Sequence, residues 1–438
     1  MTVTVIGAGK MGLPLIAQFA SKGAGVWACD ANPAVVNAIN QGVCPIDEPG
    51  ISELLAEAVA SGKIRATGDT TAAVRESEVI VVIVPVLLTA GQDADLSIIE
   101  AVSRQIAAGL RPGTMVSYET TLPVGSTRRL AAILEGSGLK AGSDFDLVFS
   151  PERVKSQLVI QRLTENPKVV GGITPGAAER AARFYSEYLG APVINVGTLE
   201  AAELVKLAGM LYRDVNIALA NELARYAEAS GINLYPVIEA ANTDGEAFLL
   251  RPGIGVGGHC TPVYPYFLIR DSQRRGLSMD LASKSRAIND QQPVLALDRV
   301  EQLWRPLRGS RAMILGLGFR PQVKEQIFSP AFLLRDELLR RGAAVFLNDP
   351  LYTDDEIRFH SFSPVKLDAP VLPEVLILNT AHMAYQDLDF GALSLRGVQV
   401  VVDGRAFWQP ETVSQAGVLY LGVGRPATRA VLAEVAVD

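Results

Sequence analysis

The sequence predicts an α/β protein in which a helical segment separates two α/β parts, and three observations lead to this prediction. From the first residues to about residue 197, short apolar runs alternate with helix-length segments, as in a parallel sheet covered on both faces by helices. Residues 199–229 contain no proline and carry apolar residues at helical spacing, which predicts one long connecting helix. From residue 311 the short apolar runs resume.

Each predicted strand is one of these apolar runs, which are shorter than a helix of usual length. In the first α/β part they are residues 2–7, 25–30, 79–84, 114–120, 146–151, 168–172 and 192–197. In the second they are residues 311–318, 344–350, 375–380, 398–404 and 418–424. The spacing of the long helix comes from Leu204, Leu207, Leu211 and Val215, and further helical patterns continue to about residue 300.

The composition argues against several classes of protein. A net charge of −7 over 438 residues does not suit a nucleic-acid-binding surface, which needs clustered lysine and arginine. No apolar run approaches the roughly 18 residues that span a bilayer, and the chain enters a strand without a signal-peptide pattern. The three cysteines and three histidines show no zinc-binding spacing. We therefore expect a cytoplasmic protein without a metal and without nucleic-acid or membrane partners.

A glycine-rich turn follows the first strand and predicts a dinucleotide site. Gly7, Gly9 and Gly12 have the GxGxxG spacing, which permits a tight turn, close approach of a pyrophosphate and close helix–strand packing. The same spacing also occurs in plain turns, but Asp30 ends the second strand, about twenty residues on, where a carboxylate can bind the ribose hydroxyls. Asp30 would repel a 2′-phosphate, so the sequence favours NAD over NADP.

The chain resembles the nucleotide-sugar dehydrogenases, which include UDP-glucose, GDP-mannose and UDP-N-acetylhexosamine 6-dehydrogenases. The resemblance runs from residue 1 to about residue 425, and it is closest to the UDP-N-acetylhexosamine branch. The motifs that carry it are "GAGKMGLPL", "ETTLPVGST", "SPERV", "ELVKLAGMLYRDVNIALANE", "RPGIGVGGHC", "ILGLGFRP" and "VVDGR".

The resemblance implies three domains and a four-electron oxidation. It implies an NAD-binding Rossmann domain over residues 1–197, a central all-helical dimerisation and catalytic domain over 198–300, and a Rossmann-like sugar-nucleotide-binding domain over 301–438. The C6 alcohol of a nucleotide sugar, expected to be UDP-linked, would pass to aldehyde and then to carboxylate with two NAD and one water. A homodimer formed through the central domain and a role in polysaccharide biosynthesis are expected with it.

The glycine-rich loop that carries Cys260 is the implied site of covalent catalysis. By resemblance Cys260 is the nucleophile, because a thiohemiacetal gives up hydride readily and the resulting thioester can be hydrolysed. The alternative is a small buried cysteine, which is the expectation for Cys29 and Cys44. His259 is adjacent in sequence, so a direct thiolate–imidazolium pair is not expected. His360 and His382 lie in no catalytic motif.

Three further positions match catalytic residues of the family. Lys206 resembles the lysine that stabilises the developing oxyanion, since a cation aimed at forming charge favours the transition state. Glu152 resembles the carboxylate that handles the hydrolytic water, and Thr121 the threonine that positions it. For Lys206 the alternative is a solvated helix lysine.

The remaining site predictions also come from the resemblance, and for the arginines a plain surface charge is the alternative. Cofactor-binding positions besides the glycines, Asp30 and Thr121 are Lys10, Met11, Pro85 and Lys324. Substrate-binding positions are Glu152, Arg153, Val154, Lys206, Arg213, Arg251, Gly255, Gly257, Tyr264, Arg320 and Arg405.

The sequence departs from the family pattern at several points. Met210 stands where an asparagine usually follows the lysine by one turn, and Tyr264 stands where an aspartate usually follows the cysteine. A methionine cannot donate to an oxyanion, and a tyrosine is neutral near pH 7. Glu246 and Ile327 each replace an arginine, and Lys324 could substitute for the second. These changes put the exact sugar in question.

Two other functions fit parts of the sequence. The β-hydroxyacid dehydrogenases share the glycine turn and a lysine on a long helix, but they lack a third α/β domain and a cysteine loop. A non-enzymatic sugar-nucleotide binder would account for Met210 and Tyr264. It would not account for the joint presence of Cys260, Lys206, Glu152 and Thr121.

Overall fold

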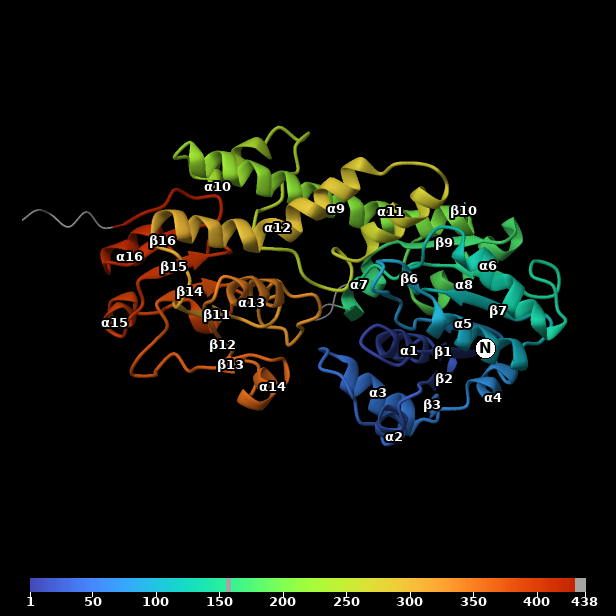
Figure 1. The fold of residues 1–438 in the computed structure, drawn as a ribbon. Helices are drawn as coiled ribbons and strands as arrows, with labels where there is room; N and C mark the ends of the chain where they lie inside the picture. The colour runs from blue at the N-terminus through green and yellow to red at the C-terminus, as the bar shows by residue number, and fades with distance from the viewer. Residues whose placement is uncertain (155–158, 430–438) are drawn as a thin grey trace, which may run out of the picture. The chain divides into compact units, whose positions relative to one another are not determined.

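The computed structural model describes residues 1–154 and 159–429 and contains two compact units, each built on one large sheet (Figure 1). Unit 1 consists of Met1–Gly209 and Tyr266–Ser278, and unit 2 of Met210–Pro265 and the chain from Met279 onward. The α/β class with a helical middle is confirmed. The three domain boundaries of the sequence analysis remain predictions.

The sheet of unit 1 has eight strands in the order β10-β9-β8-β7-β4-β1-β2-β3. From β3 to β8 this is the strand order of a doubly wound nucleotide-binding fold, with its switch point between β1 and β4. A separate two-stranded hairpin, β5 with β6, follows β4. The strands are β1 (Thr2–Ile6), β2 (Gly25–Cys29), β3 (Ile64–Thr67), β4 (Val79–Val82), β5 (Leu87–Leu88), β6 (Ala94–Asp95), β7 (Met115–Tyr118), β8 (Asp146–Phe149), β9 (Lys168–Gly172) and β10 (Val193–Thr198).

Helices cover this sheet because its strands are apolar on both faces. Val79–Val82 and Met115–Tyr118 are buried throughout, as a sheet sandwiched between helices requires. Val3 and Val5 share one core cluster with residues of α1 and α8. The helices are α1 (Gly12–Ser21), α2 (Pro33–Asn40), α3 (Ile51–Ala60), α4 (Thr70–Arg75), α5 (Ser97–Gly109), α6 (Ser126–Leu134), η1 (Glu135–Ser137), α7 (Val159–Glu165) and α8 (Pro175–Tyr188).

The sheet is not parallel throughout, contrary to the expectation from the apolar runs. Strands β8 and β9 pair antiparallel, with Val148 opposite Gly172 and Phe149 opposite Gly171. The chain leaves β8 at its carboxyl end and returns beside it, and the Ser150 hydroxyl donates to the Val169 carbonyl at 2.7 Å. Continuing the register beyond the paired residues sets Lys168 opposite Glu152, which the sequence pattern alone does not reveal.

Unit 2 repeats the doubly wound arrangement in a six-stranded parallel sheet of order β13-β12-β11-β14-β15-β16. Alternate residues of β11 face opposite cores: Ile314 packs with α12 and α13, and Met313 packs with α15 and α16. The strands are β11 (Arg311–Leu315), β12 (Ala344–Asn348), β13 (Ser363–Pro364), β14 (Val375–Leu378), β15 (Val400–Asp403) and β16 (Leu419–Gly422).

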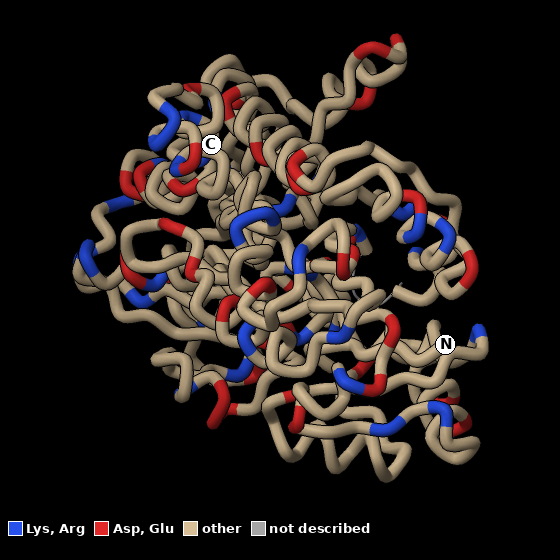
Figure 2. Tube along the Cα trace, turned by 90° about the vertical axis from the view of Figure 1, so that its right-hand side faces the viewer, with Lys and Arg blue, Asp and Glu red and all other residues tan. Residues whose placement is uncertain are grey.

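The predicted long helix is present as α9 (Leu199–Ala229), and its residues fall in both units. The other helices of this half of the chain are α10 (Leu234–Ala241), α11 (Tyr264–Arg274), α12 (Asp280–Leu303), α13 (Pro330–Arg340), α14 (Asp354–Phe359), η2 (Met383–Tyr385), α15 (Phe390–Leu395) and α16 (Pro410–Gln415). Within the described ranges, no helix is long and apolar enough to cross a membrane. Figure 2 shows lysine and arginine interspersed with aspartate and glutamate along the trace.

Candidate active site

The glycine turn between β1 and α1 has the geometry that the sequence predicts. Gly7 has a φ of +101°, and an added Cβ there would lie 2.4 Å from the Ile83 carbonyl oxygen of the neighbouring strand end. A Cβ on Gly12 would lie 1.7 Å from the Gly7 oxygen, so only glycine permits this contact between turn and helix. Asp30 accepts the N–H of Ala8 at 2.9 Å, which places its carboxylate beside the turn.

This turn fits a dinucleotide. An added Cβ on Gly9 would meet nothing within 4 Å, so the backbone is open on that side and a pyrophosphate can approach it. Lys10 is exposed and Met11 half-buried at the start of α1, and Pro85 is exposed beyond β4. The backbone and the Asp30 carboxylate therefore suit NAD, whereas the contacts of Lys10, Met11 and Pro85 with it remain predictions.

Two predicted catalytic residues meet in unit 1, within a buried cluster that also contains two residues absent from the predictions. Lys206 of α9 donates from Nζ to the backbone carbonyl oxygen of Glu152 at 2.7 Å. Lys168 donates from Nζ to Glu119 at 2.6 Å and to the Glu152 carboxylate at 3.2 Å. We call Glu119, Glu152, Lys168 and Lys206 the acid–lysine cluster; all four are buried.

Burial and charge pull in opposite directions on the pKa values of this cluster. Burial raises the pKa of Glu152, but the cations of Lys168 and Lys206 and the N–H groups of Val154 and Arg153 together outweigh burial, and the net pKa lies below its usual value. Burial raises the pKa of Glu119 to about 7, since Lys168 offsets only part of the cost. Burial lowers the pKa of Lys168, but its two carboxylate partners raise this pKa by more than burial lowers it. The lysine therefore stays charged. Glu152 is thus ionised at neutral pH.

The segment that follows Thr121 is held by a carboxylate of α9. Thr121 is buried just beyond β7. Glu203 of α9 accepts the backbone N–H and the hydroxyl of Thr127, at 2.8 and 2.7 Å, and the N–H of Gly125. This carboxylate therefore caps the start of α6, which the residue types of α9 did not indicate.

The cysteine loop lies in unit 2, and glycines let it pack on the segment after β11. An added Cβ on Gly257 would lie 2.4 Å from the Cβ of Phe319. An added Cβ on Gly258 would lie 2.9 Å from the aromatic ring of Phe319. Gly258 also donates its N–H to the Ile327 carbonyl at 3.0 Å. Cys260 is partly buried and accepts the Tyr264 N–H on its carbonyl at 2.9 Å, at the start of α11.

The same unit brings Arg405 to this loop. Arg405 donates from Nε to the Asn379 carbonyl at 2.7 Å, and both of its terminal nitrogens lie 3.4 Å from the Gly255 carbonyl oxygen. Burial lowers the pKa of Arg405, with Asp403 among the groups that oppose this. Arg320 is half-buried next to Phe319. The predicted substrate residues Gly255, Gly257, Arg320 and Arg405 therefore belong to one neighbourhood at the carboxyl ends of this sheet.

A second turn in unit 2 repeats the first, although no sequence repeat suggested it. Gly316 follows β11 with a φ of +95°, and an added Cβ would lie 2.4 Å from Thr380 beyond β14. Asp349 ends β12 and accepts the N–H of Leu317 at 2.7 Å, as Asp30 does for Ala8. The pair "GAG" and "GLG", each with an aspartate at the end of the next strand, is the signal that could have revealed it.

The other predicted residues have local partners or exposed positions. Arg251 is exposed and donates to Glu239 at 3.3 Å, and Lys324 pairs with Glu356. Tyr264 lies with its hydroxyl 3.4 Å from His259 Nδ1. Arg153 is half-buried and donates to the Pro167 carbonyl, Arg213 is exposed, and Val154 gives its N–H to Glu152 at 2.9 Å. Their binding roles remain predictions.

The catalytic predictions divide between the two units. Lys206, Glu152 and Thr121 belong to unit 1, and Cys260 belongs to unit 2 together with Met210. Sequence reasoning missed Glu119 and Lys168. The signal for both is a charged residue at the end of an otherwise apolar strand run, in "YET" and "KVVGG".

Three family domains match the chain in order. Residues 1–189 match the NAD binding domain of the UDP-glucose/GDP-mannose dehydrogenase family, residues 200–291 its central domain, and residues 313–410 its UDP binding domain.

Whole-chain relatives and solved structures agree with these domains. The chain is 32% identical to UDP-N-acetyl-D-mannosamine dehydrogenase of Pyrococcus horikoshii, over 97% of this chain and 99% of the relative. It is 31% identical to NDP-N-acetyl-D-galactosaminuronic acid dehydrogenase of Ralstonia nicotianae, over 94% and 97%. The solved structure of the Pyrococcus horikoshii enzyme superposes with a TM-score of 0.88 at 30% identity, covering 97% of this chain and 99% of that one. A UDP-glucose dehydrogenase structure from Pyrobaculum islandicum gives 0.86 at 28% identity, covering 97% and 98%.

Proposed function

Because the chain belongs to the UDP-glucose/GDP-mannose dehydrogenase family and is an NAD-dependent enzyme of that family, we propose that it oxidises C6 of a UDP-linked N-acetylhexosamine to the uronate. The observation that carries this choice of sugar is full-length identity of 31–34% to relatives named for N-acetylmannosamine and N-acetylgalactosaminuronic acid. The motif "SPERV" points to the same branch.

We assign the covalent step to Cys260. Its thiolate would add to the C6 aldehyde, and the thiohemiacetal that forms loses hydride to leave a thioester. NAD, when bound at the turn between β1 and α1, accepts the hydride of each oxidation. The glycines at 257 and 258 keep the loop close to Phe319, and this fixes the path of the backbone that leads to Cys260.

Three residues of unit 1 would act on oxygen atoms of the substrate. Lys206 is buried, and its ammonium would stabilise an oxyanion at C6. Glu152 is ionised and buried, so it can accept a proton from the water that cleaves the thioester. Thr121 would orient that water. Cleavage forms a C–O bond, breaks the C–S bond and releases the Cys260 thiolate.

Arginines of unit 2 would hold the nucleotide diphosphate. Arg320 and Arg405 lie at the carboxyl ends of a doubly wound sheet, where such folds bind ligands. The guanidinium of Arg405, in the "DGR" turn, donates to the Gly255 carbonyl oxygen. Arg405 would therefore couple nucleotide binding to the glycine-rich loop.

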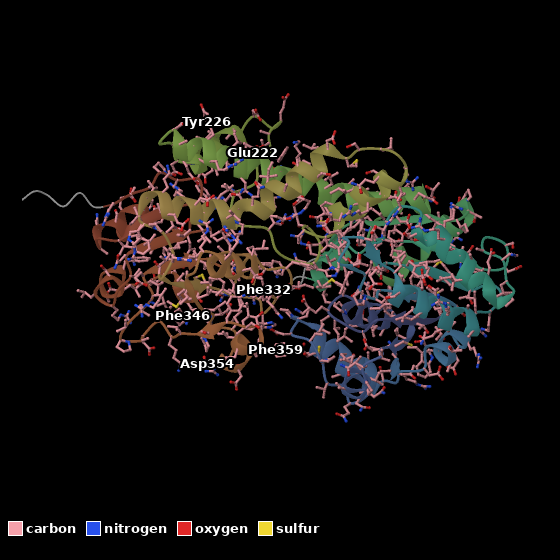
Figure 3. All side chains as sticks on the ribbon, in the orientation of Figure 1. Glu222, Tyr226, Phe332, Phe346, Asp354 and Phe359 are labelled. Atoms are coloured by element: carbon pink, nitrogen blue, oxygen red, sulfur yellow. The ribbon has the colours of Figure 1, made fainter. Side chains whose placement is uncertain are left out.

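We also propose a homodimer in which α9 of one subunit packs on its counterpart. Tyr212, Leu219 and Tyr226 are spaced seven residues apart on this helix and are 59, 45 and 71% exposed. A row of apolar side chains at this spacing lies along one side of a helix, as at a helix–helix seam. Figure 3 labels Tyr226 and Glu222 on this helix.

A panel of nucleotide sugars with NADH stoichiometry tests the proposal. UDP-N-acetylmannosamine, UDP-N-acetylglucosamine, UDP-N-acetylgalactosamine and UDP-glucose are each mixed with the enzyme and NAD. We expect two NADH for each N-acetylhexosamine consumed, with carboxylate product and no free aldehyde. A preference for UDP-glucose, or one NADH per sugar, would contradict the proposal.

A further inference from the structure

Lys168 lies between two carboxylates in the interior of unit 1. Its Nζ is 2.6 Å from Glu119 and 3.2 Å from Glu152, and the lysine side chain is 5% exposed. The antiparallel register of β8 and β9 produces this arrangement, because it sets the first residue of β9 against the segment that follows β8. One buried ammonium is therefore shared by two carboxylates, which differs from a simple ion pair.

Both carboxylates are held on their other oxygen as well. Glu152 accepts on Oε1 the backbone N–H groups of Arg153 and Val154, at 2.6 and 2.9 Å, and Lys168 approaches Oε2. Glu119 accepts the Tyr185 hydroxyl on Oε1 at 2.7 Å. Within the part of the chain that the structure describes, the Lys168 side chain and the backbone N–H groups of Arg153 and Val154 therefore set the orientation of the Glu152 carboxylate.

We propose that Lys168 is a positioning residue that fixes and ionises Glu152, and that Glu119 competes with Glu152 for the Lys168 cation. The assignment of Glu152 to the hydrolytic water rests on the proposed function, but the control of its carboxylate by Lys168 does not. Lys168 acts through Glu152 and not on the substrate.

Among the described residues, the charged side chains that interact with Glu152 or its cation come from three elements, and Arg162 of α7 lines the same small pocket as Glu152. Lys168 is on β9, Lys206 is on α9 and Glu119 follows β7. Lys206 donates to the backbone carbonyl of Glu152, whereas Lys168 contacts the carboxylate itself. Loss of Lys168 therefore removes the cation in direct contact with the titrating group, and Lys206 stays in place. This carboxylate titrates at higher pH without that cation.

The first experiment measures the ionisation of Glu152 without substrate. Infrared difference spectra between acidic and neutral pH are recorded, and the carboxyl band of Glu152 is identified as the band lost in Glu152→Gln. In Lys168→Met this band should titrate about one pH unit or more higher than in the wild type. In Lys168→Arg it should stay near the wild-type position, because the charge is kept.

A second pair of variants guards against misfolding of Lys168→Met, which leaves two carboxylates without their cation. The double variant Lys168→Met/Glu119→Gln removes one charge of each sign, and Glu119→Gln alone is its matched control. We expect the upward shift of the Glu152 titration in the double variant. In Glu119→Gln the titration should stay in place or move lower, because Lys168 loses its competitor.

The kinetic experiment follows from the spectroscopic one. The acid limb of NADH production should move to higher pH in the double variant, and an adduct on Cys260 should accumulate because thioester cleavage slows. A wild type that oxidises none of the sugars would reject the proposed function while leaving the spectroscopic result valid. A Glu152 band that titrates identically in the double variant and in Glu119→Gln would overturn the role of Lys168. An upward shift in Glu119→Gln would overturn the competition by Glu119.

Discussion

The ammonium of Lys206 lies 2.7 Å from the backbone carbonyl oxygen of Glu152, so the first turns of α9 are tied to the segment that follows β8. Three residues earlier on the same helix, Glu203 binds the N–H groups of Gly125 and Thr127 in the segment that follows β7. One helix thus contacts both segments that carry the predicted catalytic residues Thr121 and Glu152. Because these contacts involve charged groups that are buried, they hold the loops in one arrangement.

The glycine turn gives a prediction that separates folding from cofactor binding. Gly9→Ala should fold normally, since an added Cβ meets nothing within 4 Å, but it should weaken NAD binding by about tenfold or more because the methyl group occupies the approach to the backbone. Gly12→Ala is the matched contrast. Its Cβ would lie 1.7 Å from the Gly7 oxygen, so it should lower the melting temperature as well. Calorimetric titration with NAD and thermal melts check both variants.

The second prediction concerns the choice of cofactor. Asp30→Ala should weaken NAD binding and reduce discrimination against NADP, because the carboxylate that repels a 2′-phosphate is lost. Since Asp30 also accepts the Ala8 N–H, some loss of stability should accompany the change. The ratio of kcat/KM for NAD and NADP is the measurement. A wild type that already prefers NADP would contradict this interpretation of Asp30.

The sequence predicted the parts of the molecule that depend on local pattern. The GxGxxG spacing and Asp30 lie within one strand–turn–helix–strand unit, and the structure places them together. The long helix from Leu199 to Ala229 also follows from its own periodicity. Such signals are carried by residues that are close along the chain.

The contacts that sequence analysis missed depend on pairing between distant segments. Lys168 meets Glu119 across 49 residues of chain, and this contact requires the antiparallel pairing of β8 and β9. Apolar runs give no strand direction, so the expectation of a wholly parallel sheet was wrong at this edge. The cap by Glu203 is similar, because it joins positions 76 residues apart.

The third prediction concerns pH and stability. Burial raises the pKa of Glu119 to about 7 in the folded protein, so the folded state binds more protons than the unfolded one between the ordinary glutamate range and pH 7. The contribution of Glu119 to stability is present at low pH and falls as pH rises through this window. Glu119→Gln cannot ionise, so its melting temperature relative to wild type should rise by roughly 2–4 °C from pH 5 to pH 8. The exposed Glu179→Gln on α8 should show no such trend.

The fourth prediction concerns assembly. Tyr226→Arg should give a monomer at micromolar concentration, because Tyr226 is 71% exposed within the apolar row of α9 and burying a charged side chain in an apolar seam costs free energy. Leu395→Arg on α15 is the control, since Leu395 is 91% exposed but lies outside that row. Light scattering of the three proteins gives the answer. A monomeric wild type, or a dimer that survives Tyr226→Arg and fails in Leu395→Arg, would reject the proposed seam.

The last prediction concerns Cys260. Cys260→Ser should lose nearly all formation of uronate, because a serine hydroxyl is a far poorer nucleophile than a thiolate near neutral pH and its ester resists hydrolysis more than a thioester. The first oxidation needs no thiolate, so a trace of aldehyde or a stable ester on residue 260 should be found by mass spectrometry of that peptide. Lys206→Ala should slow oxidation without leaving an adduct, which separates the two roles. Full turnover to uronate by Cys260→Ser would exclude the thioester route, and Tyr264, whose N–H is bound to the Cys260 carbonyl at 2.9 Å, would become the residue to test next.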